Sequence, residues 1–110
     1  MDSFNVIMAP RAVEQLDDFI DYIQYTLLND QAAKSVYNDA LETVEELKTV
    51  AASLQYCRNS KLRQRGYRVI NFRQHQYLML YLVKGRNVYV EAVYHQRQDY
   101  ENTFVENMNG

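Results

Sequence analysis

The sequence predicts a single α+β domain with the element order β-α-α-β-β-β, in which a helix hairpin packs on one face of a small, mainly antiparallel sheet. Two helix-period apolar stripes in the first half and three strand-like segments in the second half give this prediction. A chain of 110 residues suits one hydrophobic core. We therefore expect one domain over residues 1–110, with an ordered core over about 3–101 and a tail over 102–110.

The first two elements are a short strand and a helix. The segment "SFNVIM" at 3–8 alternates weakly between polar and apolar residues and predicts the strand. Pro10 can begin the helix, because a proline in the first turn gives up no hydrogen-bonded N–H group. Apolar residues then recur at spacings of three and four from Val13 to Leu27, which places them on one helix face.

A second helix is expected over roughly 31–53, with Asn29 or Asp30 as its N-cap. Its apolar stripe runs from Ala33 to Ala51 at the same helical spacing. Because the connection between the two helices is short, they should form an antiparallel hairpin.

After Leu54 the hydrophobic period changes from helical to strand-like. The segment "GYRVINFRQ" at 66–74 predicts a strand that Gly66 opens. The run "QYLMLYLV" at 76–83 is continuously apolar, as is typical of a central strand that is covered on both faces. The segment "NVYVEAVYHQ" at 87–96 alternates. The short turns between these strands predict an antiparallel meander, and residues 97–110 allow a final helical turn or helix before the tail.

Strand alternation and helix period together assign side chains to faces. In the last strand, one face is expected to carry Val88, Val90, Ala92 and Tyr94, and the other Tyr89, Glu91, Val93 and His95. The core should be dominated by Val13, Leu16, Ile20, Ile23, Val36, Leu41, Val44, Leu47, Ile70, Phe72, Leu80, Leu82, Val88 and Val90.

Charge is segregated along the chain. Residues 1–46 carry a net charge of −8, residues 47–90 carry +9 without a single acid, and residues 91–110 carry −3. The whole-chain value of −2 therefore conceals a strongly basic segment. A basic surface of this kind favours an anionic partner.

The basic residues that we expect to bind such a partner gather in "CRNSKLRQRGYRVINFR" at 57–73. Arginine can hold phosphate or carboxylate groups through two parallel hydrogen bonds. The partner would be a nucleic acid, the ribosome or an acidic protein segment; a solvated basic loop is the plain alternative. Arg68 and Arg73 should point to opposite faces of their strand, and Lys84 and Arg86 should lie at a hairpin tip. The candidate binding residues are Arg58, Lys61, Arg63, Arg65, Arg73 and Arg97.

His95 is a candidate for acid–base chemistry, because it should end the last strand on the same face as Glu91. Arg97 would point the same way if the strand continued. RNA cleavage needs a base for the 2′-OH, a cation for the phosphate charge and an acid for the leaving oxygen. A hydrogen-bonded structural histidine is the alternative. His75, in the turn "RQHQ", is expected to be exposed.

The sequence does not indicate a disulfide-bonded, metal-binding, cofactor-binding, secreted or membrane-spanning protein. Cys57 is the sole cysteine, so neither a disulfide nor a cysteine metal site is expected. Phosphate-loop, dinucleotide, zinc-protease and serine-hydrolase motifs are absent, so we expect no cofactor and no bound metal. The first ten residues lack signal-peptide features and the longest apolar run is too short to span a bilayer, so we expect a cytoplasmic protein that does not enter the membrane.

The segment "YLMLYLVKGRNVYVEAVYHQRQDY" resembles the C-terminal block of the RelE/ParE toxins of bacterial type II toxin–antitoxin systems. In that block, a strand with aromatic and apolar residues is followed by a short turn, an alternating strand and a His-x-x-x-Asp-aromatic ending. Here the ending is His95, Asp99 and Tyr100. The short strand, the proline-initiated helix and the helix hairpin resemble the family too, so the resemblance covers roughly residues 3–101.

The resemblance implies a cognate antitoxin and one of two activities. RelE-like and YoeB-like toxins cleave mRNA in the ribosomal A site without a metal, whereas ParE-like toxins inhibit DNA gyrase. A third alternative that the resemblance leaves open is a non-toxic relative that only regulates its operon together with its partner. A nuclease would use His95, Arg68 and Glu91.

Two features make the chain more similar to the ParE-like branch. Where the nuclease branch carries a catalytic arginine after the aromatic residue of the third strand, this sequence has Leu78. A rival alignment of "KLRQRGYR" makes Arg68 that arginine, but it leaves one strand too many. The ending "HQRQDY" also resembles ParE. We therefore expect a gyrase poison that serves in plasmid stabilisation, with mRNA cleavage as the alternative.

Overall fold

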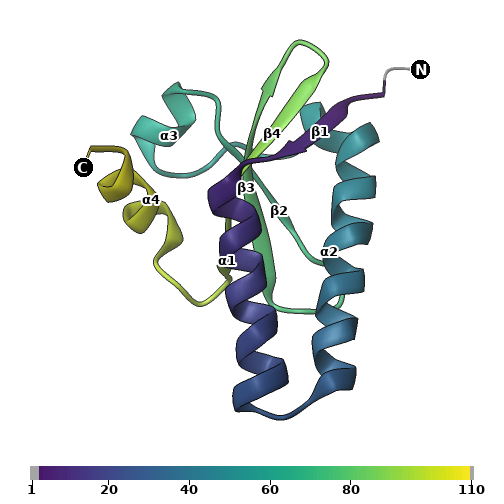
Figure 1. Ribbon diagram of the computed structural model, residues 1–110. Helices are drawn as coiled ribbons and strands as arrows, with labels where there is room; N and C mark the ends of the chain where they lie inside the picture. The colour runs from purple at the N-terminus through teal and green to yellow at the C-terminus, as the bar shows by residue number, and fades with distance from the viewer. Residues whose placement is uncertain (1–2, 110) are drawn as a thin grey trace.

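The computed structural model describes residues 3–109 and confirms the predicted α+β fold (Figure 1). Its sheet has the strand order β1-β4-β3-β2, in which β1 runs parallel to β4 and the other neighbours are antiparallel. The strands are β1 Asn5–Met8, β2 Arg68–Asn71, β3 Tyr77–Lys84 and β4 Asn87–His95. The helices are α1 Pro10–Asp21, α2 Asp30–Val50, α3 Ser60–Gln64 and α4 Tyr100–Asn109.

The helix hairpin forms as predicted. Pro10 is the first residue of α1, which continues into a π-helical turn at Tyr22–Thr26. Leu28 then adopts a positive φ of 53° and reverses the chain. The side chain of Asn29 accepts a hydrogen bond from the backbone N–H of Ala32 at 3.0 Å, so Asn29 is the N-cap of α2. A 3-10 turn at Ala51–Ser53 follows α2.

Two predicted core residues are on the solvent side of the helices. Val13 is 42% exposed and Leu41 is 50% exposed, so both assignments are wrong. The faces that pack on the sheet instead carry Ala12 and Ala40, whose small side chains allow the helix backbones to approach the strands closely. The remaining predicted core residues are buried or half-buried.

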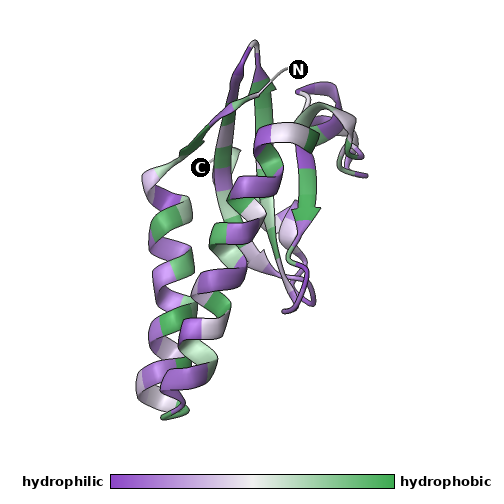
Figure 2. Ribbon diagram, turned by 90° about the vertical axis from the view of Figure 1, so that its right-hand side faces the viewer, coloured by the Kyte–Doolittle hydropathy of each residue, from purple (hydrophilic) through white to green (hydrophobic). Residues whose placement is uncertain are grey.

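Both faces of the sheet are covered. Alternate side chains of β3 pack into two separate apolar clusters, one on each face. Met79 and Tyr81 join the cluster that α1 and α2 cover, whereas Leu78 and Leu80 join the cluster that contains Phe104 of α4. Figure 2 shows that apolar residues recur along the strands and the helices, alternating with polar residues on the helices. The continuous apolar run of β3 therefore lies in a central strand that is buried on both faces, as predicted.

A β-bulge in β4 overturns the predicted faces of that strand. Leu80 pairs with Ala92 and Tyr81 pairs with Val90, so Glu91 is the extra residue. Because side chains alternate with period two, one extra residue exchanges the faces of everything after it. Val88 and Val90 consequently share the helix-side cluster with Val93, and Ala92 and Tyr94 lie on the opposite face.

Three further expectations differ from the structure. The segment expected as a loop before the meander contains α3. The final helix that the sequence allowed is α4, which extends to Asn109 and so includes most of the segment expected as a tail from residue 102. The strand expected over 66–74 is limited to Arg68–Asn71, so Arg73 lies beyond its end. Within residues 3–109, no helix is both long enough and apolar enough to cross a membrane.

Candidate functional site

The basic segment is built around the short helix α3. The side chain of Asn59 caps this helix by accepting hydrogen bonds from the backbone N–H groups of Lys61 and Leu62, at 2.9 and 3.3 Å. At the other end, Gly66 has a φ of 89°, and the N–H of Tyr67 returns to the carbonyl of Leu62 at 3.0 Å. This Schellman arrangement ends α3 after little more than one turn.

Two contacts fix α3 to the rest of the domain. Leu62 is fully buried in the cluster with Phe104. The Glu101 carboxylate of α4 accepts a hydrogen bond from the backbone N–H of Asn59 at 2.6 Å. The backbone of α3 is thus held in place by the rest of the domain, and this fixes the positions from which its charged side chains extend.

We define the basic surface as Arg58, Lys61, Arg63 and Arg65, all of which are exposed. Arg63 hydrogen-bonds the carbonyl oxygens of Cys57 and Arg58, and so also braces the chain that leads into α3. Between residues 3 and 109, no ion pair joins any of these four cations to an acid. Their charges are therefore available to an anionic partner.

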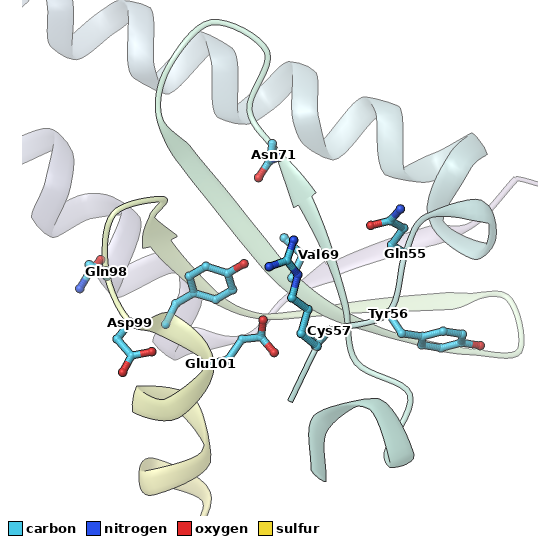
Figure 3. A pocket seen from close by; sticks show the side chains of 10 residues that line it. Gln55, Tyr56, Cys57, Val69, Asn71, Gln98, Asp99 and Glu101 are labelled. Atoms are coloured by element: carbon cyan, nitrogen blue, oxygen red, sulfur yellow. The ribbon is translucent and has the colours of Figure 1, made fainter. Parts of the chain in front are cut away.

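A hollow of about 410 Å³ lies beside the basic surface, at the outer edge of β2, where Tyr56 forms a β-bridge with Arg68 (Figure 3). Its lining includes Arg58 from the segment before α3, Val69 and Asn71 from β2, and the acidic residues Asp99 and Glu101. Burial, followed by the charge of Glu101, raises the pKa of the Cys57 thiol to about 12. Cys57 is consequently protonated at neutral pH and cannot act as a nucleophile there.

Arg68 is occupied by contacts within the fold. Its guanidinium donates to the carbonyl oxygen of Leu54, just past the end of α2, and to the Tyr56 hydroxyl at 2.7 Å. It also stacks over the Tyr56 ring, with its central carbon 3.9 Å from the ring centroid. These contacts assign Arg68 to holding the 54–56 segment against the sheet.

His95 and Glu91 do not share a face, contrary to the sequence prediction. The His95 ring packs edge-on against Tyr77, with centroids 5.3 Å apart, and Tyr77 in turn contacts the ring of Phe19 in α1 at a tilted angle. Burial, and then the charge of Glu91, raise the pKa of Tyr67, which belongs to the cluster on the other side of the sheet. The bulge at Glu91 is the physical cause of this separation.

His95 is also remote from Arg68. In the sheet register, His95 pairs with Tyr77 and Arg68 pairs with Tyr81. Four residues along a strand correspond to about 13 Å. Leu78, which occupies the place of the nuclease arginine in the preferred alignment, is only 1% exposed. The structure thus does not gather the three candidate nuclease residues around one point.

The remaining basic candidates lie away from α3. Arg73 forms an ion pair with Glu46 of α2 at 2.9 Å. Arg97 lies in the loop after β4, where its backbone N–H donates to Nδ1 of His95 at 3.1 Å. Lys84 and Arg86 flank Gly85 at the β3–β4 hairpin, and Gly85 adopts the positive φ of 62° that a two-residue turn needs.

One polar cluster was not predicted from the sequence, and the predicted exposure of one of its members is wrong. His75 was expected to be exposed, but its side chain is partly buried and hydrogen-bonds Asp39 of α2. Asp39 follows Val36 by three residues and so occupies a position on the buried stripe of α2. An acid at such a position was the available signal, because a buried carboxylate needs a polar partner. No group of three or more metal-ligating side chains occurs within residues 3–109.

Comparisons with known proteins agree with this architecture. A family model described as "ParE toxin of type II toxin-antitoxin system, parDE" matches residues 6–100. A solved structure titled "Chromosomal ParDE TA system from P. aeruginosa" is similar in fold, with a TM-score of 0.69 and 20% sequence identity. The match covers 84% of this chain and 96% of that one. Among curated proteins there is no significant match.

Proposed function

This chain belongs to the ParE toxin family of type II toxin–antitoxin systems, and from that premise we propose that it stops growth by poisoning DNA gyrase. It would act in the cytoplasm and be neutralised by a cognate antitoxin. The proposal names the target, which the family assignment leaves open.

The observation that carries the choice of gyrase over mRNA is the dispersal of the candidate nuclease residues. Metal-free RNA cleavage needs its base, acid and phosphate-binding cation within hydrogen-bond reach of one scissile phosphate. Here Arg68 is engaged by Leu54 and Tyr56, and His95 lies about 13 Å away along the sheet. Leu78 is buried and cannot contact RNA. A toxin that works by binding needs no such convergence.

The purified protein should inhibit DNA supercoiling by gyrase and leave mRNA intact in a translating extract. Both assays should use the same preparation, so that an inactive sample cannot mimic either result. The proposal would be overturned by cleavage of translated mRNA at the ribosomal A site that is lost in folded His95→Ala and Arg68→Ala variants. In that event the rival alignment, with Arg68 as the catalytic arginine, would be correct.

We also propose that the antitoxin presents acidic side chains to the basic surface. Lys61 and Arg65 are the best probes, because their side chains are exposed and form no hydrogen bond between residues 3 and 109. The double variant Lys61→Glu/Arg65→Glu should slow association with the antitoxin by roughly tenfold at low salt, because complementary charge accelerates encounter. The salt dependence of the association rate should become flatter.

The matched control reverses two charges on α2, in Lys34→Glu/Lys48→Glu. It changes the net charge equally but leaves α3 intact, so it should alter association much less. Stopped-flow or surface-based kinetics over a range of salt concentrations provides the measurement. Equal effects of the two double variants would show that only net charge matters and that the basic surface is not a contact site.

A further inference from the structure

Ser35, His75 and Asp39 form a linear hydrogen-bonded series between α2 and the β2–β3 turn, which lies beside α2 (Figure 1). The Ser35 hydroxyl oxygen is 3.3 Å from Nε2 of His75. On the other side of the ring, Nδ1 is 2.8 Å from the Asp39 carboxylate. None of these residues belongs to the basic surface or to the hollow beside it.

The hydrogen bonds define which ring nitrogen carries the proton. The Asp39 side chain is fully buried, and the same oxygen accepts the backbone N–H groups of Gln74 at 3.0 Å and His75 at 2.9 Å. Because this carboxylate oxygen acts as an acceptor, Nδ1 of a neutral His75 must be the donor. The lone pair of Nε2 then faces the Ser35 hydroxyl, as a general base requires.

Ser35 differs from most of the other serine and threonine residues in the helical segments. A serine or threonine inside a helix commonly donates to a carbonyl three or four residues earlier. That local bond is made here by Thr43, Thr49, Ser53 and Thr103. Ser35 makes no such bond in the part of the chain that the structure describes, and its hydroxyl is directed to the imidazole instead.

The hydroxyl is accessible to a small molecule. An open depression of about 340 Å³ is lined by Asn29, Gln31, Ala32, Ser35 and His75. The side-chain oxygen of Asn29 accepts the backbone N–H of Ala32, so the NH₂ group of the same amide takes no part in that cap. Asn29 and Gln31 therefore supply neutral donors beside Ser35, the kind of group that stabilises a developing oxyanion. The depression contains no cation, which favours an uncharged substrate over a phosphate.

We propose that Ser35 is a nucleophile for acyl transfer from small uncharged esters, with His75 as its general base. The Ser35 oxygen adds to the ester carbonyl while its proton moves to Nε2 of His75. The C–O bond to the alcohol then breaks, and the alcohol leaves with that proton. Water, deprotonated by the same nitrogen, cleaves the acyl-serine to the carboxylic acid and restores the hydroxyl. Asp39 is a positioning residue that acts only through His75. This activity is independent of gyrase inhibition.

A fluorophosphonate probe tests the proposal, because a serine oxygen activated in this way displaces fluoride and forms a stable bond to phosphorus. Whole-protein mass spectrometry should show one adduct, and peptide mapping should place it on Ser35. Ser35→Ala should abolish labelling, and His75→Gln should slow it by about 100-fold or more. Ser53→Ala, which removes a hydroxyl that bonds Val50, is the matched control and should be labelled like the parent.

The role of Asp39 has its own readout. The nitrogen chemical shifts of the His75 ring should show the proton on Nδ1 in the parent protein, and Asp39→Asn should lose that preference and label more slowly. Circular dichroism melting verifies that each variant is folded. The absence of labelling in the parent, labelling spread over several hydroxyls, or labelling that persists in Ser35→Ala would each overturn the proposal.

Discussion

Replacing Phe104 by alanine is expected to lower the free energy of unfolding by about 3–5 kcal/mol, the range for removing a fully buried aromatic ring. Phe104 is 1% exposed and packs edge-on against Tyr67, with ring centroids 5.2 Å apart. The Arg11 guanidinium covers the ring at 4.9 Å. The ring therefore joins α4 to both α1 and the cluster that anchors α3.

Urea denaturation monitored by circular dichroism measures this loss. Glu106→Ala is the control, because it lies on the exposed side of the same helix and should alter stability by less than about 0.5 kcal/mol. If Phe104→Ala were as stable as Glu106→Ala, α4 would not pack as the structure shows, and residues 102–109 would be a tail after all.

Leu47→Ala is expected to destabilise the domain by about 2–5 kcal/mol. Leu47 is 0% exposed and lies in the cluster between α2 and the sheet, so its truncation leaves a cavity that the surrounding side chains cannot fill. The matched control is Leu41→Ala, which is the same substitution on the same helix at a position that is 50% exposed. Leu41→Ala should lower the free energy of unfolding much less. A large difference between the two variants would show that Leu47, and not Leu41, lies on the buried face of α2.

Equal losses in the two variants would contradict the structure and restore the predicted stripe that included Leu41. Thermal melting can replace urea as the readout, provided that both variants unfold reversibly.

The parts of the fold that follow from local pattern were predictable. Pro10, the cap at Asn29 and the uninterrupted apolar run of β3 each have a strong signature in the sequence, and each is where it was expected. The bulge at Glu91 was not predictable, because Ala92, Val93 and Tyr94 after it are all apolar and buried, so the sequence pattern does not show the change of face that the extra residue causes. It alone moved Val93 to the helix side and separated Glu91 from His95.

The candidate sites divide in the same way. The basic surface could be located from charge alone, since its residues are close together in the sequence. The helix α3 that presents it was missed, because its five residues are too few to show helical periodicity. The series from Ser35 to His75 depends on contact across 40 residues, and no local pattern encodes such a contact.

The parallel pairing of β1 with β4 has a consequence for the order in which the chain can fold. Asn5 pairs with Asn87 and Met8 pairs with Val90. The residues of β1 are therefore synthesised long before the residues of β4 with which they pair. At the usual rate of synthesis, this interval is roughly 4–16 seconds. Such non-local pairing slows folding, since a long loop must close before the contact is gained. The sheet can thus be completed only after Val90 has been synthesised.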